Sequence, residues 1–243
     1  MWVKLAAETL GALDGARAET DAFDTLVAYA KGLGADLVSY HHIAPPFSTR
    51  HENFSLLSKG FPEDWVRQYR EQKLHRVDPI TSFAAYQTRP VLWSQVPDRV
   101  RLTDEQHNYM TLLNSWLSPG DGLAIPAFGP SGRHGYVGIG RRTPIDHWTP
   151  PQVRMVQAVC ESFHLRFCEL RLAGLDKDFE LTERELRILT GMAKGWTDPM
   201  IGAQVGLRPD AVRAAMRQIL EKMAVSDRPS AVLRAKALGL VEA

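Results

Sequence analysis

The stretch IGAQVGLRPDAVRAAMRQILEKM, residues 201–223, decides how the C-terminal part of the chain folds. Apolar residues recur at helical spacing on both sides of the short segment 206–208, and Pro209 stands where a second helix can begin. Two short helices joined by a tight turn form a helix-turn-helix, an arrangement that many DNA-binding proteins use. The helix that begins at Pro209 is therefore the candidate recognition helix.

This second helix has an apolar side and a basic side. Arg213 and Arg217 lie four residues apart and therefore project from one side. From Arg208 to Lys236 there are seven basic and three acidic residues, a local net charge of +4 in a chain of net charge +1. Such a basic patch suits phosphate contacts, although any small helical bundle also carries outward arginines. The predicted core positions of the helix are Val212, Met216, Ile219 and Met223.

The surrounding C-terminal sequence is also predicted to be helical. A capping box of Thr182 with Glu185 begins one helix, which ends at Gly195, and a further helix begins at Thr197. The short polar segment 173–178 separates these helices from what precedes them. We therefore predict a first domain at residues 1–172, a linker at 173–178 and a helical domain at 179–243.

The first 172 residues alternate between strand and helix patterns. Residues 35–44 are rich in β-branched and aromatic side chains and predict a strand, and residues 122–142 predict two strands joined by a turn. Thr103 and Gln106 form a capping box at the start of a helix, and residues 150–172 form a long amphipathic helix. This mixture predicts an α/β domain followed by a small all-α domain.

The composition excludes several classes of protein. With 44% hydrophobic and 23% charged residues, the chain is globular, and its start lacks the features of a signal peptide. No stretch approaches the eighteen or so apolar residues of a membrane span, so we expect a cytoplasmic protein with no membrane contact. Cys160 and Cys168 are eight residues apart, about 12 Å along a helix, which is too far for a disulfide. No Cys/His set has zinc spacing, and we expect reduced thiols and no metal or cofactor.

A group of aromatic and acidic residues in the first domain points to a ligand pocket. Trp65 and Tyr69 lie four residues apart on one face of a predicted helix, and Asp78, Pro79 and Trp93 follow. A carboxylate accepts from an amide N–H, an indole N–H donates to a carbonyl, and aromatic rings enclose apolar groups. The group therefore predicts a pocket for a neutral amide ligand. The alternative is that the aromatic residues are core residues and Asp78 caps a helix that begins at Pro79.

The C-terminal segment resembles the helix-turn-helix of the LuxR family of transcription regulators. The resemblance covers roughly sixty residues and includes Glu185, Leu189, Gly195 and the VSDR junction at 225–228. It implies that the protein is a homodimer that binds a roughly palindromic promoter site, with two recognition helices about one DNA turn apart. The residues implied in DNA contacts are Arg213, Arg217, Arg208, Gln218 and Thr197.

The first domain resembles the autoinducer-binding domain that precedes this module in the family. The family's Trp, Tyr, Asp-Pro and Trp fall on Trp65, Tyr69, Asp78-Pro79 and Trp93. The resemblance implies an α-β-α sandwich, in which helices flank an antiparallel sheet. It also implies an N-acyl-homoserine lactone ligand, with Trp65 on the lactone carbonyl and Asp78 on the amide N–H. The implied ligand-binding residues are Trp65, Asp78, Tyr69, Trp93, Phe61 and Gly138.

Two pocket positions depart from the family pattern. Phe61 stands where the family commonly has Tyr, and Gly138 stands where many members have Ser or Thr. Each change removes a hydroxyl, and a missing hydrogen bond to a buried carbonyl costs roughly 1–3 kcal/mol. Either His41, Tyr40 or a water replaces the lost donors, or the preferred ligand has an aryl or branched acyl chain. Gly138 is also expected to enlarge the pocket locally.

The recognition helix departs from the family pattern as well. Arg208 stands where the family usually has Ser or Thr. Ala211 stands where it usually has Thr, and Ala215 where it often has His. These changes remove phosphate anchors and the side-chain cap of the helix, and a lost cap costs about 1 kcal/mol. The target sequence is therefore expected to differ from those of typical members.

Other functions have less support from the sequence. An enzyme is not expected, because His41 and His42 are adjacent on a strand and point to opposite faces, and Asp78 has no carboxylate partner. The main alternative is a LuxR-type member that senses a different small molecule, or one that acts through a protein partner instead of DNA. Retention of Asp78 argues against it, since a carboxylate without a partner in an apolar pocket is costly.

Overall fold

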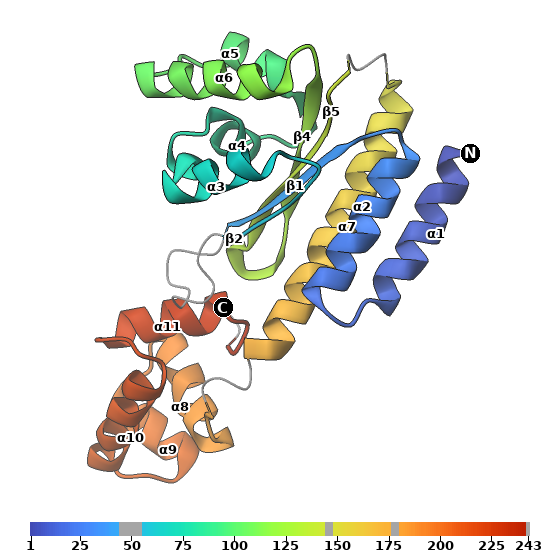
Figure 1. Ribbon diagram of the computed structural model, residues 1–243. Helices are drawn as coiled ribbons and strands as arrows, with labels where there is room; N and C mark the ends of the chain where they lie inside the picture. Colours follow the sequence, from blue (N-terminus) through green and yellow to red (C-terminus); the bar gives the residue numbers. More distant parts are fainter. Residues whose placement is uncertain (44–54, 144–147, 176–179, 242–243) are drawn as a thin grey trace. The chain divides into compact units, whose positions relative to one another are not determined.

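The computed structural model describes residues 1–43, 55–143, 148–175 and 180–241 (Figure 1). These residues form two compact units, one built from residues between 1 and 168 and one that includes the helices after residue 175. Helix α7 (Pro150–Leu175) continues into the segment expected to be a linker. The domain bounds at 172 and 179 stay a prediction.

The first unit is built on a five-stranded sheet in which every pair of neighbouring strands is antiparallel. The strand order is β2-β1-β5-β4-β3, so the two strands of the predicted hairpin, β4 and β5, lie beside each other near the centre. The strands are β1 (Leu37–Ile43), β2 (Ser55–Lys59), β3 (Val91–Leu92), β4 (Asp121–Phe128) and β5 (His134–Arg141).

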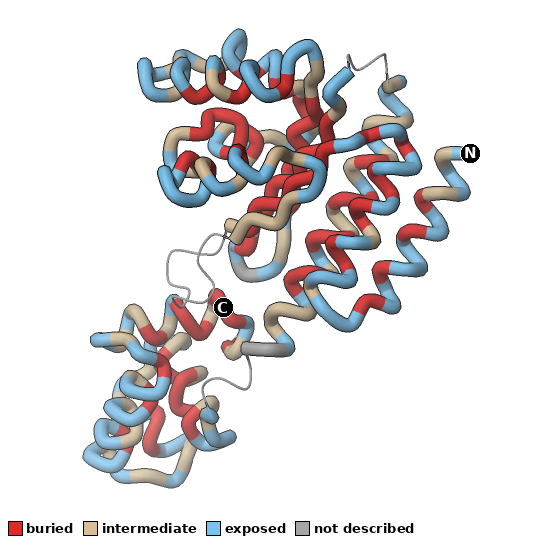
Figure 2. The backbone as a smooth tube through the Cα atoms, viewed as in Figure 1, coloured by how far each residue is buried: buried red, intermediate tan, exposed pale blue. Residues whose placement is uncertain are grey.

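Helices cover both faces of this sheet, which confirms the predicted α-β-α sandwich (Figure 1). One face is covered by α2 and α7, with α1 packed against α2, and the other by α3 to α6. Figure 2 shows that burial concentrates in the sheet and on the helix sides that face it. The further helices are α1 (Trp2–Gly15), α2 (Glu19–Gly32), α3 (Glu63–Glu71), α4 (Pro79–Ala84), α5 (Val96–Arg99) and α6 (Asp104–Leu117).

The face under α7 is a tightly packed aromatic core. The ring of Tyr40 lies 4.8 Å from that of Phe163 and 4.7 Å from that of Phe167, and its hydroxyl is 2.7 Å from Nδ1 of His164. Side chains alternate along a strand, so Tyr40 and His41 face opposite ways. The expectation that Tyr40 replaces a hydroxyl in the ligand pocket is therefore wrong, because Tyr40 belongs to the other face.

The second unit is a small helical domain with its own core. The four predicted helices are present as α8 (Glu183–Ala193), α9 (Asp198–Val205), α10 (Pro209–Lys222) and α11 (Arg228–Ala237). Gly206 ends α9 with a φ of 72°, a left-handed conformation that favours glycine and allows the tight turn into α10. The core includes Ile188, Leu189, Ile201, Val212, Ile219, Met223 and Ala231.

Glu185 has two structural roles in this domain. It closes the predicted capping box with Thr182, and its Oε2 accepts from Nζ of Lys222 at 2.8 Å, which ties α8 to α10. Burial alone would raise the pKa of Glu185, but the hydrogen bonds from Lys222 and Thr182 outweigh burial and hold the pKa below its ordinary value. The capping box predicted at Thr103 and Gln106 is also confirmed.

Candidate ligand pocket and nucleic-acid interface

The first unit contains a cavity between the sheet and helices α3, α4 and α6. The cavity is small, with a volume of about 40 Å³. The walls therefore lie close together, and a ligand must fit tightly or separate them. Five of the six predicted ligand-binding residues line the cavity: Phe61, Trp65, Tyr69, Asp78 and Trp93. The other lining residues are Ser39, His41, Leu56, Ser58, Val66, Ile80, Tyr109, Leu113 and Tyr136.

Asp78 is the centre of the polar part of this cavity. It caps α4, with its Oδ1 accepting from the backbone N–H of Ile80 at 2.8 Å and of Thr81 at 3.3 Å. Its Oδ2 accepts from the hydroxyl of Tyr69 at 2.8 Å and from that of Thr81 at 2.9 Å, and the phenol of Tyr109 also interacts with it. A carboxylate has about four lone-pair sites, so neighbouring protein groups already satisfy it. The capping interpretation of Asp78 is confirmed. Because the carboxylate has protein partners, its retention does not argue against the alternative of a LuxR-type member that senses a different small molecule.

Burial sets the protonation states around Asp78. Burial raises the pKa of Asp78, and the hydrogen bonds from Tyr69 and Thr81 partly oppose that rise. Burial, followed by the nearby Asp78 charge, raises the pKa of Tyr109 and Tyr136 well above the ordinary value, so both phenols stay neutral hydrogen-bond donors. Burial, followed by the positive charge of His75, lowers the pKa of His41 to about 3.

The indole of Trp93 lies against a floor of three glycines in β4 and β5. A Cβ placed on Gly122 would lie 2.6 Å from the Trp93 ring, and one on Gly138 or Gly140 would lie 2.9 Å from it. Glycine is needed at these positions because only a bare backbone allows the ring this close. Trp93 Nε1 is buried and has no hydrogen bond of normal geometry among the described residues. The indole is nevertheless close enough to the Tyr136 hydroxyl to oppose part of the rise in the pKa of Tyr136.

Gly138 does not enlarge the cavity, contrary to expectation. The position of its missing Cβ lies 2.5 Å from Ser39 Oγ and 3.0 Å from the Tyr136 hydroxyl, as well as close to Trp93. Two hydroxyls from neighbouring positions therefore fill the space that a side chain on residue 138 would take. Ser39 and Tyr136 were missed from the sequence. Strand alternation in β1 and β5 could have identified them, because residues 39, 41, 136 and 138 share one face.

The second candidate site is the exposed side of α10 and the start of α9. All five residues predicted to contact DNA are exposed: Arg213, Arg217, Arg208, Gln218 and Thr197. Arg208 is the N-cap of α10 and Thr197 the N-cap of α9, and neither side chain makes a capping hydrogen bond. The missing side-chain cap of the recognition helix agrees with the departure seen in the sequence.

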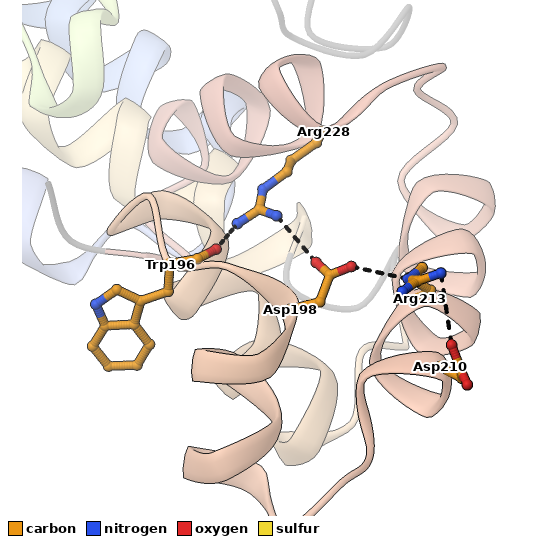
Figure 3. A network of polar contacts seen from close by, with 5 residues as sticks. All are labelled: Trp196, Asp198, Asp210, Arg213 and Arg228. Atoms are coloured by element: carbon orange, nitrogen blue, oxygen red, sulfur yellow. Dashed lines mark hydrogen bonds and ion pairs between the residues drawn. The ribbon is translucent and has the colours of Figure 1, made fainter.

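One of the predicted base-contacting residues is engaged in ion pairs within the domain (Figure 3). Nε of Arg213 lies 3.2 Å from Oδ2 of Asp198, and its Nη1 lies 3.6 Å from Oδ1 of Asp210. Arg228 lies on the other side of Asp198, with its Nη1 3.5 Å from Oδ1, and it also donates to the carbonyl oxygen of Trp196. Spacing in the sequence does not reveal the contacts of Asp198, because Asp198, Arg213 and Arg228 come from three different helices.

No metal centre or membrane span accompanies these sites within the described ranges. The described His, Cys, Asp and Glu side chains form no group of three or more that could hold a metal ion. None of the described helices combines the length and the apolar character needed to cross a bilayer.

Two families match the chain, one for each unit. Residues 18–167 match the autoinducer binding domain, and residues 180–235 match bacterial regulatory proteins of the luxR family. The transcriptional activator protein PhzR of Pseudomonas fluorescens is 26% identical over 193 residues, which cover 75% of this chain and 74% of PhzR. The quorum sensing-dependent transcriptional regulator RpaR of Rhodopseudomonas palustris is 27% identical over 186 residues, covering 76% of this chain and 74% of RpaR.

Solved structures show the same fold. Escherichia coli SdiA aligns over 100% of both chains with a TM-score of 0.73 at 16% identity. SdiA in complex with octanoyl-rac-glycerol covers 99% of this chain and 97% of that one, with a TM-score of 0.72 at 15% identity. These identities are low, so the likeness bears on the fold alone. Because the autoinducer-binding match spans more than half of the chain and the luxR-type match follows it, the protein belongs to the LuxR family of transcription regulators.

Proposed function

We propose that this protein binds an N-acyl-homoserine lactone in the cavity around Asp78 and promoter DNA through α10. The observation that carries the ligand proposal is a buried carboxylate among hydroxyl donors inside an aromatic-walled cavity. An acyl-homoserine lactone offers matching chemistry, with one amide N–H, two carbonyl groups and an apolar chain. As a regulator of promoters, the protein acts in the cytoplasm.

The amide N–H must replace a protein donor on Asp78. With four protein hydrogen bonds and the Tyr109 phenol already on the carboxylate, no lone pair of Asp78 is left for the ligand amide. The two backbone donors and Thr81 belong to α4, whereas the hydroxyl of Tyr69 comes from α3. Tyr69 or Tyr109 is therefore the group that turns away and becomes a donor to the ligand instead.

The acyl carbonyl has donors in this cavity despite Phe61 and Gly138. Ser39 Oγ and the Tyr136 hydroxyl both lie within 3.0 Å of the point where a side chain on residue 138 would begin. We assign them the role of the hydroxyl that Gly138 lacks. Trp65, which lines the same cavity, is the proposed donor to the lactone carbonyl.

DNA binding is proposed on the exposed basic side of α10. Arg208, Arg213, Arg217 and Gln218 are all exposed there, and Thr197 is exposed at the start of α9. Two recognition helices in a homodimer would read two half-sites of a palindromic promoter. The exposed side of α7, which includes Leu165 at 46% exposure, is the proposed dimer surface.

The ligand proposal is tested by thermal unfolding with a panel of straight, branched and aryl acyl-homoserine lactones. A ligand at 100 times its Kd stabilises the folded state by about 2.7 kcal/mol, which is readily seen as a rise in Tm. We expect one lactone to raise Tm, and we expect Asp78→Asn to reduce that rise. The Asn side-chain oxygen can still cap α4, but its amide nitrogen cannot accept a hydrogen bond in place of the second carboxylate oxygen.

A second ligand class is the matched comparison in this experiment. Octanoyl glycerol has an acyl carbonyl and an apolar chain but no amide N–H, and an SdiA structure contains it. If octanoyl glycerol raises Tm as much as the best lactone, and Asp78→Asn changes neither shift, recognition of the ligand amide by Asp78 is wrong. The alternative of a LuxR-type regulator that senses a different small molecule is then favoured.

A further inference from the structure

Asp198 joins three helices of the second domain through two arginines. It is the first residue of α9, and it lies between Arg213 of α10 and Arg228 at the start of α11 (Figure 3). Arg228 is held in turn by the carbonyl oxygen of Trp196. The Asp198 carboxylate is thus fixed from one side and presents its Oδ2 to Arg213 at 3.2 Å.

The contact with Asp198 uses only one edge of the Arg213 guanidinium. Arginine has five N–H donors arranged in a plane, and Asp198 takes the one on Nε. The terminal nitrogens Nη1 and Nη2 remain for another partner, apart from the pair with Asp210 at 3.6 Å. This terminal edge can donate two parallel hydrogen bonds to O6 and N7 of guanine in the major groove.

The two aspartates that contact Arg213 are not equivalent. The Asp210 side chain is 92% exposed, and a pair this exposed contributes little and is easily exchanged for a new partner. The Asp198 side chain is 23% exposed and has a second arginine to hold it. On contact with DNA, the structure therefore favours release of Asp210 and retention of Asp198.

We infer that Asp198 is a positioning residue for base recognition, which orients Arg213 so that its terminal edge meets a guanine. The inference rests on the proposed binding of DNA by α10. A carboxylate near the DNA also repels phosphates, so Asp198 weakens binding to any sequence while it sharpens the choice among sequences. A residue that only stabilised the fold would not have these two opposite effects.

The experiment compares full-length wild-type protein with Asp198→Asn, Asp198→Glu and Arg213→Ala, with saturating lactone where one has been found. Sites are first selected from a randomised duplex library with the wild-type protein. Affinity is then measured for the selected site, for each single-base change in it and for an unrelated duplex, over a range of salt concentrations. Glu183→Gln is the matched control, since Glu183 is the exposed first residue of α8 and its replacement removes the same charge.

For Asp198→Asn we expect loss of preference at one guanine of each half-site, a preference worth about 5- to 150-fold for a bidentate contact. Affinity for the unrelated duplex is expected to rise, with a salt slope steeper by about one, because a freed Arg213 gains a phosphate. Arg213→Ala should lose preference at the same guanine without that gain. Asp198→Glu should recover part of the preference, and Glu183→Gln should keep all of it.

The outcomes separate this inference from the proposal on which it rests. If wild-type protein selects no sequence and shows no salt-dependent binding, DNA binding itself fails. If wild-type protein selects a site but Asp198→Asn keeps every base preference, the positioning role of Asp198 is wrong and DNA binding stands. If Asp198→Asn weakens binding to all duplexes equally, its role is structural and the inference is likewise overturned.

Discussion

The two candidate sites are each organised around one carboxylate, and the two carboxylates work under opposite conditions. Asp78 is 4% exposed and accepts four hydrogen bonds from uncharged groups. Asp198 has a side chain that is 23% exposed and is paired with two arginines, one of them 63% exposed. The hydrogen bonds around Asp78 form a buried and satisfied network in which every change is costly, whereas the network around Asp198 is partly exposed and can exchange partners.

The largest effect is expected at Asp78. Asp78→Ala removes the cap of α4 and leaves the hydroxyls of Tyr69 and Thr81 without their acceptor, so we expect a loss of about 3 kcal/mol in the free energy of unfolding. Asp78→Asn keeps an acceptor for the backbone N–H groups of α4 and should lose less. Urea unfolding of the ligand-free proteins measures both. Equal stability of Asp78→Ala and the wild type would show that the buried network is not satisfied as described.

The next largest effect is expected at Gly138, where a new side chain would overlap with the Ser39 hydroxyl. Gly138→Ser places a Cβ within 2.5 Å of Ser39 Oγ, so we expect a destabilisation of about 1–3 kcal/mol. Adding Ser39→Gly should restore part of that loss, since it removes the Ser39 Oγ contact but leaves the Trp93 ring 2.9 Å from the new Cβ. A double-mutant cycle in urea measures the coupling between the two positions. Strictly additive changes would contradict the shared space.

The stabilities of the two domains should depend on pH in opposite ways. Because the pKa of Asp78 is raised by burial, the folded state holds a proton that the unfolded state has lost, and stability falls as pH rises from the ordinary value of 3.8 through the raised pKa. Glu185 has a pKa lowered from 4.5 by Lys222 and Thr182, so its contribution grows as pH rises from the lowered pKa to 4.5. The cost of Asp78→Asn should therefore shrink with rising pH, and that of Glu185→Gln should grow.

These opposite slopes are measured by chemical unfolding of the wild type and the two variants. The range runs from about pH 3.5 to about pH 7 and so begins near the ordinary pKa values of acidic side chains. The difference between wild type and variant isolates each group. Two slopes of the same sign would contradict the assignment of burial as the dominant influence at Asp78.

The smallest effect on stability is expected at Asp198. Its ion pairs with Arg213 and Arg228 are partly exposed, and such pairs contribute under about 1 kcal/mol. Asp198→Asn should therefore change Tm only slightly, even though we propose that it alters the choice of DNA sequence. A large loss of stability in this variant would place Asp198 with Asp78 as a structural carboxylate and would remove the contrast between the two sites.

Much of the fold could be predicted because its signals are local. The capping boxes at Thr103 and Thr182, the turn at Gly206 and the proline at the start of α10 each mark a helix end within a few residues. The pocket residues Trp65, Tyr69 and Asp78 were also identified from short spacings. Local patterns of this kind survive in the folded chain because caps and turns are satisfied by neighbours in sequence.

The remainder depends on contacts between residues that are distant in sequence. Ser39 and Gly138 meet only through the register of β1 with β5, and Tyr109 reaches Asp78 from a different helix. The Asp198 network likewise joins α9, α10 and α11. Patterns in a single sequence do not indicate such long-range contacts. Only the three-dimensional structure identifies the donors to Asp78 and the partner of Arg213.

The glycine floor beneath Trp93 limits how the ligand preference of this protein can evolve or be redesigned. Gly122, Gly138 and Gly140 are closed to any side chain while the indole lies on them, so substitutions in these parts of β4 and β5 act on the tryptophan before they act on a ligand. The sheet residues that line the cavity and remain open to change are Ser39, His41, Leu56, Ser58 and Tyr136. A saturation library at these positions should yield altered ligand preferences, while one at the three glycines should yield mainly unfolded protein.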